Sequence, residues 1–356
     1  MRRVRWDVYC RVIDNFGDIG VCWRLARELA SRGERVRLVA DDLSALRWMA
    51  PRGAPGVTTT AWSDAADSGA EVVVEAFGAD LPEATQAALA RRSLSLTWVN
   101  LEYLSAEPYV ERSHGLPSPR MHGPAAGATK HFFYPGFTPA TGGLLRERDL
   151  LAQRAAFDRD AWLAARGWPR MRHERVVVLF GYPQPALRPL LGRLATEPTL
   201  LLLAGGPMQA AALEALRGLP RRRSLRAVAL PFLSQTEFDR MIWSADLAFV
   251  RGEDSPVRAI WAAVPFVWQL YPQSDGAHRP KLEAFLDRLL DGAPAHLVGP
   301  VGACFRAWNG FRPEALFDSQ WPDPAAWRRQ VETFRGTLLT QLDLATQLQR
   351  FVASRR

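Results

Sequence analysis

The feature that most constrains this chain is the regular alternation of strand-like and helix-like segments along its first half. Apolar side chains recur with period two over residues 4–12, then at helical spacing from Ile19 to Leu29, and the pattern stops at Gly33. Further strand patterns cover residues 36–40, 72–77 and 94–99. A helical pattern over 81–91 lies between the last two of these strands. Strands and helices in alternation predict a parallel sheet with helices on its faces.

The alternation pauses and then resumes in the second half. Residues 103–143 are rich in Pro, Gly, Ser and His, which predicts a long loop region with one short strand at 131–134. A helical stretch over 147–166 leads into the second series. Its strands are expected at 176–180, 199–204, 225–230, 247–250 and 266–270. Its helices are expected at 185–194, 208–216, 235–244 and 256–263.

The sequence therefore predicts two Rossmann-like α/β domains, a division that 356 residues easily allow. The amphipathic, strandless stretch 325–352 predicts helix that can pack back across the domain boundary. The expected parts are an N-terminal domain over 1–150, a C-terminal domain over 151–325 and a terminal helix over 326–356.

Composition excludes several classes of protein. Three cysteines cannot build a disulfide framework, and no apolar run is long enough to span a bilayer, so we expect a cytoplasmic protein without membrane contact. The six histidines are scattered and no metal-ligand spacing is present, so we expect neither a metal nor another cofactor. Neither lysine follows a glycine, which excludes a Walker A phosphate loop.

The net charge of +8 suggests a nucleic-acid binder, but the kind of basic residue and its distribution along the chain argue against one. Forty-three arginines stand against two lysines, a skew that reflects genome base composition. Residues 1–150 carry equal numbers of basic and acidic side chains, so the whole excess lies in 151–356. The charge is therefore compatible with an anionic nucleotide bound in the second half, and we expect no direct nucleic-acid contact.

The loop after the first strand reads Asp-Asn-Phe-Gly-Asp-Ile-Gly over residues 14–20. Ligands bind at the carboxyl ends of strands in open α/β sheets. The loop lacks the G-x-G-x-x-G spacing of nicotinamide-binding folds. Asp14 and Asp18 suit metal binding, a glycosidase-like pair or one general base with a supporting neighbour. The simpler alternative is that Asp18 caps the helix and Asp14 forms a turn.

A second informative segment runs from Phe249 to Arg258, where a strand ends and a helix with Pro256 in its first turn begins. Asp254 or Ser255 is expected to cap that helix. The free amides of the first turn, together with Arg251, then predict a diphosphate site that needs no metal. Glu253 can bond sugar or ribose hydroxyls, and the simpler alternative is an ordinary cap beside a surface arginine.

Four aromatic residues also follow the carboxyl ends of strands in the second half. There a base could stack on a ring, or a phenol could reach phosphate, although core packing is the default for any one of them. These residues are Phe180, Tyr182, Phe232 and Tyr271.

Two α/β domains with a metal-free diphosphate site and facing carboxylates resemble the GT-B glycosyltransferases, whose domains face each other across a cleft. The strings that begin at Asp14 and run to Arg27, from Arg251 to Ser255 and from Phe266 to Gln273 resemble, more narrowly, the bacterial protein-arginine rhamnosyltransferases that modify elongation factor P. That resemblance runs essentially end to end. It implies an inverting, metal-independent transfer of L-rhamnose from TDP-β-L-rhamnose to an arginine of that factor.

The resemblance also implies roles for individual residues. Asp18 would be the general base, Asp14 would hold the acceptor guanidinium or tune Asp18, and Glu253 would lie near the sugar and be catalytically important. Thymine would be held by Phe232 and Gln235. Ribose and diphosphate would be surrounded by Tyr182, Arg251, Asp254, Ser255 and Tyr271. The substrate site would also include Asn15, Phe16, Gly17 and Gly252.

Other functions remain open at this stage. The same architecture serves glycosyltransferases with glycan or lipid acceptors and sugar-nucleotide epimerases. A non-enzymatic arginine-rich nucleic-acid binder is the alternative from a different class, and it predicts steeply salt-dependent binding to duplex.

Overall fold

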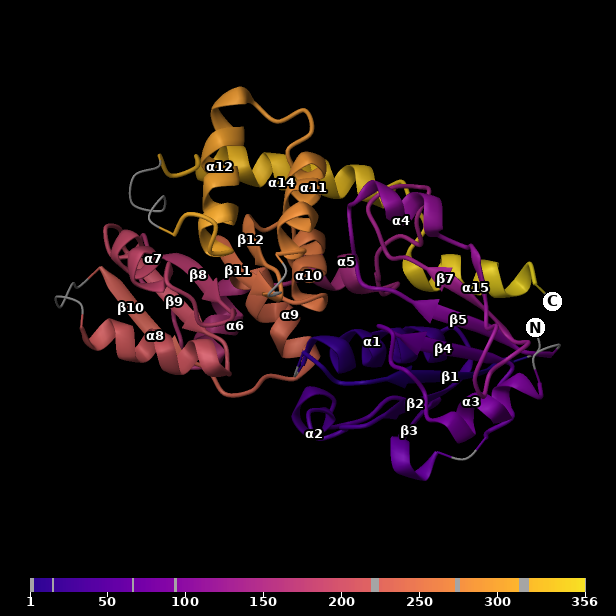
Figure 1. Cartoon of the computed structure of the whole chain (residues 1–356). Helices are drawn as coiled ribbons and strands as arrows, with labels where there is room; N and C mark the ends of the chain where they lie inside the picture. The colour runs from indigo at the N-terminus through magenta and orange to yellow at the C-terminus, as the bar shows by residue number, and fades with distance from the viewer. Residues whose placement is uncertain are drawn as a thin grey trace. The chain divides into compact units, whose positions relative to one another are not determined.

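The computed structural model describes residues 3–14, 16–65, 67–92, 95–218, 224–272, 276–313 and 320–355. The chain divides into two compact units, one formed by residues 1–148 with 338–356 and the other by residues 149–337 (Figure 1). Within the described ranges no helix has the length and apolar character needed to cross a membrane.

The first unit is built on a seven-stranded sheet of order β3-β2-β1-β4-β5-β7-β6, in which only the β6–β7 pair is antiparallel. Its strands are β1 (Arg5–Cys10), β2 (Arg35–Ala40), β3 (Val57–Ala61), β4 (Val72–Ala76), β5 (Thr97–Leu101), β6 (Pro117–Pro119) and β7 (Thr129–Phe133). Its helices are α1 (Gly17–Ser31), α2 (Leu46–Met49), the short 3₁₀ helix η1 (Trp62–Asp64), α3 (Glu83–Ala90), α4 (Pro108–Ser113) and α15 (Leu344–Ala353).

Both faces of this sheet are covered, as the period-two pattern of β1 requires. Trp6 and Val8 pack in one core cluster with the apolar side of α1. Tyr9, on the other face of β1, packs in a second cluster with Trp98 and with Leu89 of α3. The central strands are therefore buried on both sides, which explains why most of their residues are apolar.

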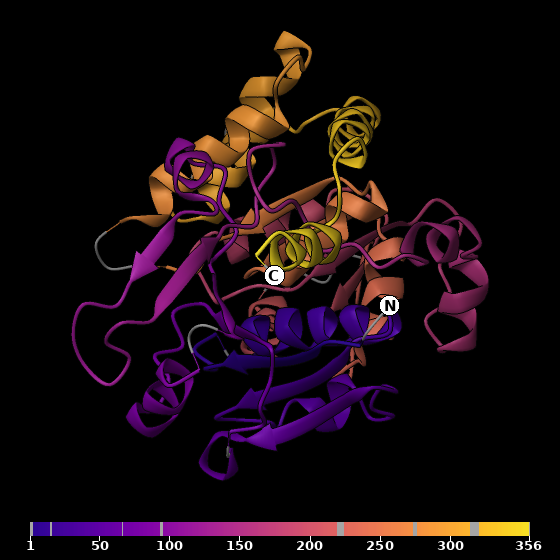
Figure 2. The ribbon, with the colours of Figure 1, turned by 90° about the vertical axis from the view of Figure 1, so that its right-hand side faces the viewer.

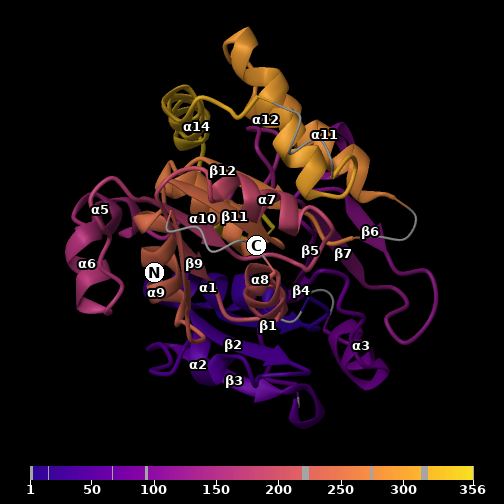
Figure 3. The ribbon, with the colours of Figure 1, turned by 90° about the vertical axis from the view of Figure 1, so that its left-hand side faces the viewer.

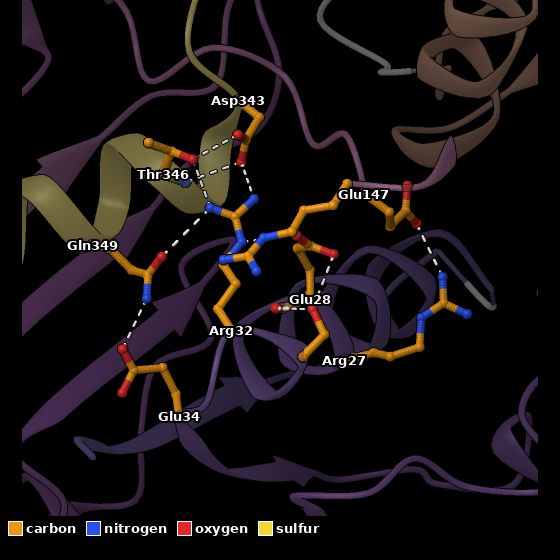
Figure 4. A network of polar contacts seen from close by, with 10 residues as sticks. Arg27, Glu28, Arg32, Glu34, Glu147, Asp343, Thr346 and Gln349 are labelled. Carbon is orange, nitrogen blue, oxygen red and sulfur yellow. Dashed lines mark hydrogen bonds and ion pairs between the residues drawn. The ribbon is translucent and has the colours of Figure 1, made fainter. Parts of the chain in front are cut away.

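Helix α15 belongs to the first unit, where it lies along α1 (Figure 2). Its apolar residues join the same core cluster as α1. A polar network fastens the two helices together (Figure 4). Arg32, at the end of α1, binds Glu28 at 2.7 Å and Asp343 at 2.7 Å. Gln349 of α15 donates to Glu34 at 2.8 Å, which adds a second connection.

The second unit holds a five-stranded, fully parallel sheet of order β10-β9-β8-β11-β12 (Figures 1 and 3). Its strands are β8 (Arg175–Leu179), β9 (Thr199–Leu203), β10 (Leu225–Ala229), β11 (Leu247–Arg251) and β12 (Phe266–Gln269). Its helices are α5 (Leu150–Ala155), α6 (Arg159–Ala165), α7 (Leu187–Leu194), α8 (Pro207–Arg217), α9 (Gln235–Ser244), α10 (Asp254–Ala262), α11 (His278–Leu289), α12 (Ala295–Trp308) and most of α14 (Pro324–Leu339). Every residue of β9, β11 and β12 is buried.

The structure confirms the expected strands and helices of both alternating series to within a few residues. It also contains elements that the sequence did not predict, among them β3, α2, α11 and α12. The helical stretch expected over 147–166 is two helices, α5 and α6, and the terminal helix is broken between α14 and α15. The break falls where Asp343 caps α15 by accepting from the amide of Thr346 at 3.0 Å. The long loop region also contains α4 and the edge strand β6.

Candidate active site

The topology of each sheet places the chemically interesting loops at a switch point. In the first unit β1 lies between β2 and β4, and in the second β8 lies between β9 and β11. At a switch point the connections from two adjacent strands lead to opposite sides, and a crevice opens between them at the carboxyl ends of the strands. Asp14 lies in the loop after β1, and Asp18 lies in the first turn of α1. Tyr182 lies in the loop after β8, and Arg251 is the last residue of β11.

The two aspartates form one compact turn at the start of α1. Asp18 is the second residue of the helix and is 1% exposed, and Asp14 is 9% exposed. The Oδ2 atom of Asp18 accepts from the backbone amides of Ile13 and Asp14, both at 2.9 Å. The simpler alternative, in which Asp18 caps the helix, is therefore wrong, because its carboxylate turns back to the preceding loop and Phe16 occupies the cap position.

The carboxylate of Asp14 lies directly over Gly17, so a side chain at this position would displace that carboxylate. A Cβ atom on Gly17 would meet Oδ2 of Asp14 at 2.8 Å, and the Gly17 amide donates to the Asp14 carbonyl at 2.7 Å. Phe16 packs edge-on against Trp48, with 5.1 Å between ring centroids. Asn15, the remaining residue predicted in this loop, lies outside the described residues.

Two buried cysteines lie beneath this turn. Cys10 ends β1 and Cys22 lies one turn beyond Asp18 in α1. A hydrogen bond with Cys10, burial and the negative charge of Asp18 raise the pKa of Cys22 well above its ordinary value. The Cys22 thiol therefore stays protonated at neutral pH, so it does not act as a nucleophile here.

In the second unit the turn between β11 and α10 is closed by Ser255. Its hydroxyl donates to the Arg251 carbonyl at 2.6 Å and accepts from the Arg251 amide at 3.0 Å. Glu253 occupies the cap position without a side-chain capping bond, so the expected cap at Asp254 or Ser255 is wrong. Gly252 permits the tight turn, since its φ is 66°.

Arg251 lies between aromatic rings at the carboxyl edge of this sheet. The residue is 5% exposed, and its guanidinium carbon lies 4.6 Å from the ring centre of Phe180 and 4.4 Å from that of Tyr182. Tyr182 in turn packs edge-on against Tyr271 at 5.5 Å. The fold thus brings together three residues that were predicted from separate segments, with Arg251 against Tyr182 and Tyr182 against Tyr271.

The loop after β10 brings a further aromatic ring toward the middle of the sheet. Phe232 is 50% exposed and covers Gly205, where a Cβ atom would meet the ring at 3.0 Å. Gly205 follows β9, the neighbour of β8. Gln235 begins α9 and is 5% exposed. The exposed ring of Phe232, which lies over a glycine, suits the stacking of a planar base.

Two residues that the sequence analysis missed fix the loops of this edge. The Gln269 side chain accepts from the Tyr182 amide at 2.8 Å and donates to the Tyr182 carbonyl at 3.1 Å. Asn309, at the end of α12, accepts from the Leu270 amide at 2.9 Å and donates to the Trp268 carbonyl at 2.8 Å. No local motif signals either role, because each partner is distant along the chain.

The side chain of Glu253 is held from α11. Lys281 donates to Oε1 of Glu253 at 3.1 Å, and its ammonium lies 5.7 Å from the ring centre of Trp268. The indole of Trp268 donates to the Gly252 carbonyl at 2.8 Å. Lys281, Trp268 and Glu253 therefore form a closed set of contacts around the turn that follows Arg251.

The described part of the chain contains no group of three or more His, Cys, Asp or Glu side chains that could hold a metal ion. Arg251 and the first-turn amides of α10 bring positive charge to the carboxyl edge of the second sheet. Such a combination suits an anion.

Comparison with known proteins gives a consistent result. A family model described as elongation factor P (EF-P) rhamnosyltransferase EarP matches residues 6–353. The protein-arginine rhamnosyltransferase of Pseudomonas aeruginosa is 40% identical over 374 residues, covering 98% of each chain. That of Pseudomonas putida is 43% identical over 337 residues, covering 86% of this chain and 87% of its own.

Solved structures agree with these sequence relatives. A structure from work on EarP-mediated arginine glycosylation of translation elongation factor EF-P superposes with a TM-score of 0.68 at 30% identity, covering 99% of both chains. The glycosyltransferase VinC, solved with dTDP, gives a TM-score of 0.52 at 13% identity over 99% of this chain and 100% of its own, which shows the fold alone. The expected α/β class, the GT-B fold of two Rossmann-like units, is confirmed.

Proposed function

The chain belongs to the EarP family of elongation factor P rhamnosyltransferases, and from this premise we propose that it transfers L-rhamnose from TDP-β-L-rhamnose to an arginine side chain of elongation factor P. The transfer is inverting and needs no metal or other cofactor. Its setting is the cytoplasm, because the acceptor is a translation factor.

The acceptor chemistry belongs to the turn after β1. A guanidinium has a pKa above about 12 and no free lone pair, so it must be oriented and must lose a proton as the new bond forms. In our proposal Asp14 orients the guanidinium and Asp18 takes the proton. The nitrogen then bonds to the anomeric carbon of rhamnose, the bond from that carbon to TDP breaks, and TDP leaves with the electron pair.

The donor chemistry belongs to the carboxyl edge of the second sheet. Phe232 and Gln235 hold the thymine. The residues proposed to surround ribose and diphosphate are Tyr182, Arg251, Asp254, Ser255 and Tyr271. Ser255 contributes through its backbone amide, since its hydroxyl closes the turn with Arg251. Arg251 and the helix start stabilise the charge that develops on TDP as the sugar acquires oxocarbenium character, while Glu253 lies near the sugar.

One observation supports this proposal most directly. Asp18 is almost fully buried, its carboxylate is fixed by two loop amides, and Asp14 stands beside it on the same turn. An aspartate at a helix start usually caps the helix. Here the turn instead holds two carboxylates near each other at the carboxyl end of a central strand, which suits a cationic acceptor.

The test is incubation of the purified enzyme with TDP-β-L-rhamnose and purified elongation factor P, followed by intact-mass measurement. The expected result is a gain of one deoxyhexosyl unit that disappears when the modified arginine is replaced by lysine. Donor turnover without a change in the factor would favour another acceptor, such as a glycan or a lipid, or an epimerase. Salt-sensitive binding to duplex without donor binding would favour the nucleic-acid alternative.

A further inference from the structure

The two lysines of the chain share an arrangement that no composition argument predicts. Against forty-three arginines only Lys130 and Lys281 occur. Lys130 pairs with Glu75 at 2.5 Å and lies 4.6 Å from the ring centre of Trp98. Lys281 pairs with Glu253 at 3.1 Å and lies 5.7 Å from that of Trp268. In a chain that uses arginine almost everywhere, both lysines pair with a glutamate beside a tryptophan.

The first of these pairs is explained by the interior of the first unit. Glu75 and Lys130 are 3% and 8% exposed. The carboxylate of Glu75 also accepts from the indole of Trp98 at 3.2 Å and from the amide of Asp80 at 3.3 Å. Lys130 therefore completes the hydrogen bonding of a buried carboxylate, a structural role.

The second pair has the same design in a different place. Glu253 occupies the cap position of α10, two residues after Arg251 ends β11, at the carboxyl edge of the second sheet. Lys281 reaches it from the first turn of α11, a segment 28 residues further along the chain. Their side chains are 12% and 18% exposed, so the pair is largely shielded from water without being sealed inside the core.

We propose that Lys281 is a positioning residue of the transfer reaction, and that its compact ammonium holds the Glu253 carboxylate in the orientation in which it meets the donor sugar. This inference rests on the proposed function. Lys281 acts through Glu253 and is not itself a catalytic residue. The Trp268 indole also donates to the Gly252 carbonyl, so the same group of residues holds the backbone of the turn.

The chemistry of the two cations explains why lysine stands here. An ammonium is a compact point charge with three rotatable donors, and that of Lys281 contacts Oε1 of Glu253. A guanidinium is planar and binds both oxygens of a carboxylate in a fork. Arginine at this position would fix the carboxylate of Glu253 in the plane of its own group, and so would change the orientation offered to a sugar hydroxyl.

The experiment compares Lys281→Met and Lys281→Arg with wild type under single-turnover conditions, using intact mass of elongation factor P as the readout. Both variants should lose at least about tenfold in rate, as expected when a catalytic group is misplaced. Affinity for TDP, measured by calorimetry, should stay within about threefold, because the diphosphate is bound by Arg251 and the helix start. Thermal unfolding confirms that each variant folds.

Arg288→Met is the matched control, since Arg288 is an exposed cation on the same helix about two turns away. Its rate should equal that of wild type. The decisive measurement is a double-mutant cycle with Glu253→Gln. If Lys281 acts through Glu253, Lys281→Met should reduce the rate of the Glu253→Gln enzyme by less than about twofold.

Each outcome has a defined meaning. Wild-type rates in Lys281→Met, or rate losses that multiply in the double variant, would overturn the positioning role. Full activity of Lys281→Arg would overturn the requirement for a compact ammonium. If wild-type enzyme modifies no elongation factor P at all, the proposed function fails and the inference falls with it, a result distinct from every comparison between active variants.

Discussion

Replacing Asp18 by asparagine separates the catalytic role of this side chain from its structural role. Oδ2 of Asp18 accepts two backbone amides at 2.9 Å, and the carbonyl oxygen of an asparagine can accept the same two. The shape of the turn is therefore kept, while the negative charge and the basicity are lost. Alanine would be a poorer choice, because it would leave the amides of Ile13 and Asp14 without this acceptor.

The structure sets the expected magnitudes. A hydrogen bond to a charged group contributes about 1.5–3 kcal/mol, against about 1 kcal/mol for a neutral pair. Loss of charge at two such bonds should therefore lower the free energy of unfolding by roughly 1–3 kcal/mol. Removal of a general base slows reactions by about 10²–10⁴-fold. Turnover should thus fall far more than stability does.

The assay follows rhamnosylation of elongation factor P by intact mass, with TDP affinity by calorimetry and thermal unfolding on the same preparations. Asp42→Asn is the control, because Asp42 also accepts a loop amide, that of Ser44 at 2.7 Å, in the loop after the neighbouring strand β2. It should turn over like wild type. Turnover of Asp18→Asn within about threefold of wild type would refute the general-base role, since base catalysis contributes much more than that.

Four further predictions follow from other contacts. Gly17→Ala places a Cβ atom 2.8 Å from Oδ2 of Asp14, so turnover measured by intact mass should fall about 10- to 100-fold with little change in thermal stability. Arg251→Met should weaken TDP binding in calorimetry by about 10- to 100-fold, through loss of charge-assisted hydrogen bonds; unchanged affinity would move the diphosphate elsewhere. EDTA should leave the initial rate unchanged, and a loss restored by added divalent metal would contradict the metal-free proposal. The hydrogen bond from Arg226 holds the pKa of Glu174 below its ordinary 4.5, so this pair stabilises the fold above that pH and the contribution disappears as pH falls through the folded-state pKa. Arg226→Met should therefore shift acid unfolding, followed by urea melts across pH 3–7, to higher pH, and an unshifted midpoint would count against the pair.

Much of the fold could be predicted because buried parallel strands leave a strong apolar signal. The edge strand β3 was missed because its central residues, Thr58 to Thr60, carry no apolar alternation, and an edge strand needs little. Strand β6 could not be predicted because Pro117 and Pro119 argue against a strand. Proline is tolerated there because β6 lies at the edge of the sheet.

The candidate site could be predicted where position along the chain implies position in the sheet. Asp14 and Asp18 follow β1 and Arg251 ends β11, so their place at a carboxyl edge could be predicted directly. The direction in which the Asp18 carboxylate turns could not be predicted, because it depends on the path of the preceding loop. Gln269 could not be found either, since its partner Tyr182 lies 87 residues away and only the folded sheet brings them together.

The return of the chain to the first unit has a consequence for synthesis. The second unit is continuous in sequence, so it is complete once residue 337 has emerged from the ribosome. The first unit must wait for Asp343 to reach Arg32 and for α15 to cover α1. At about 5–20 residues per second the intervening 149–337 segment takes roughly 10–40 s to make. The unit that carries both aspartates thus begins first and is finished last, and the part of α1 that α15 covers stays uncovered in between.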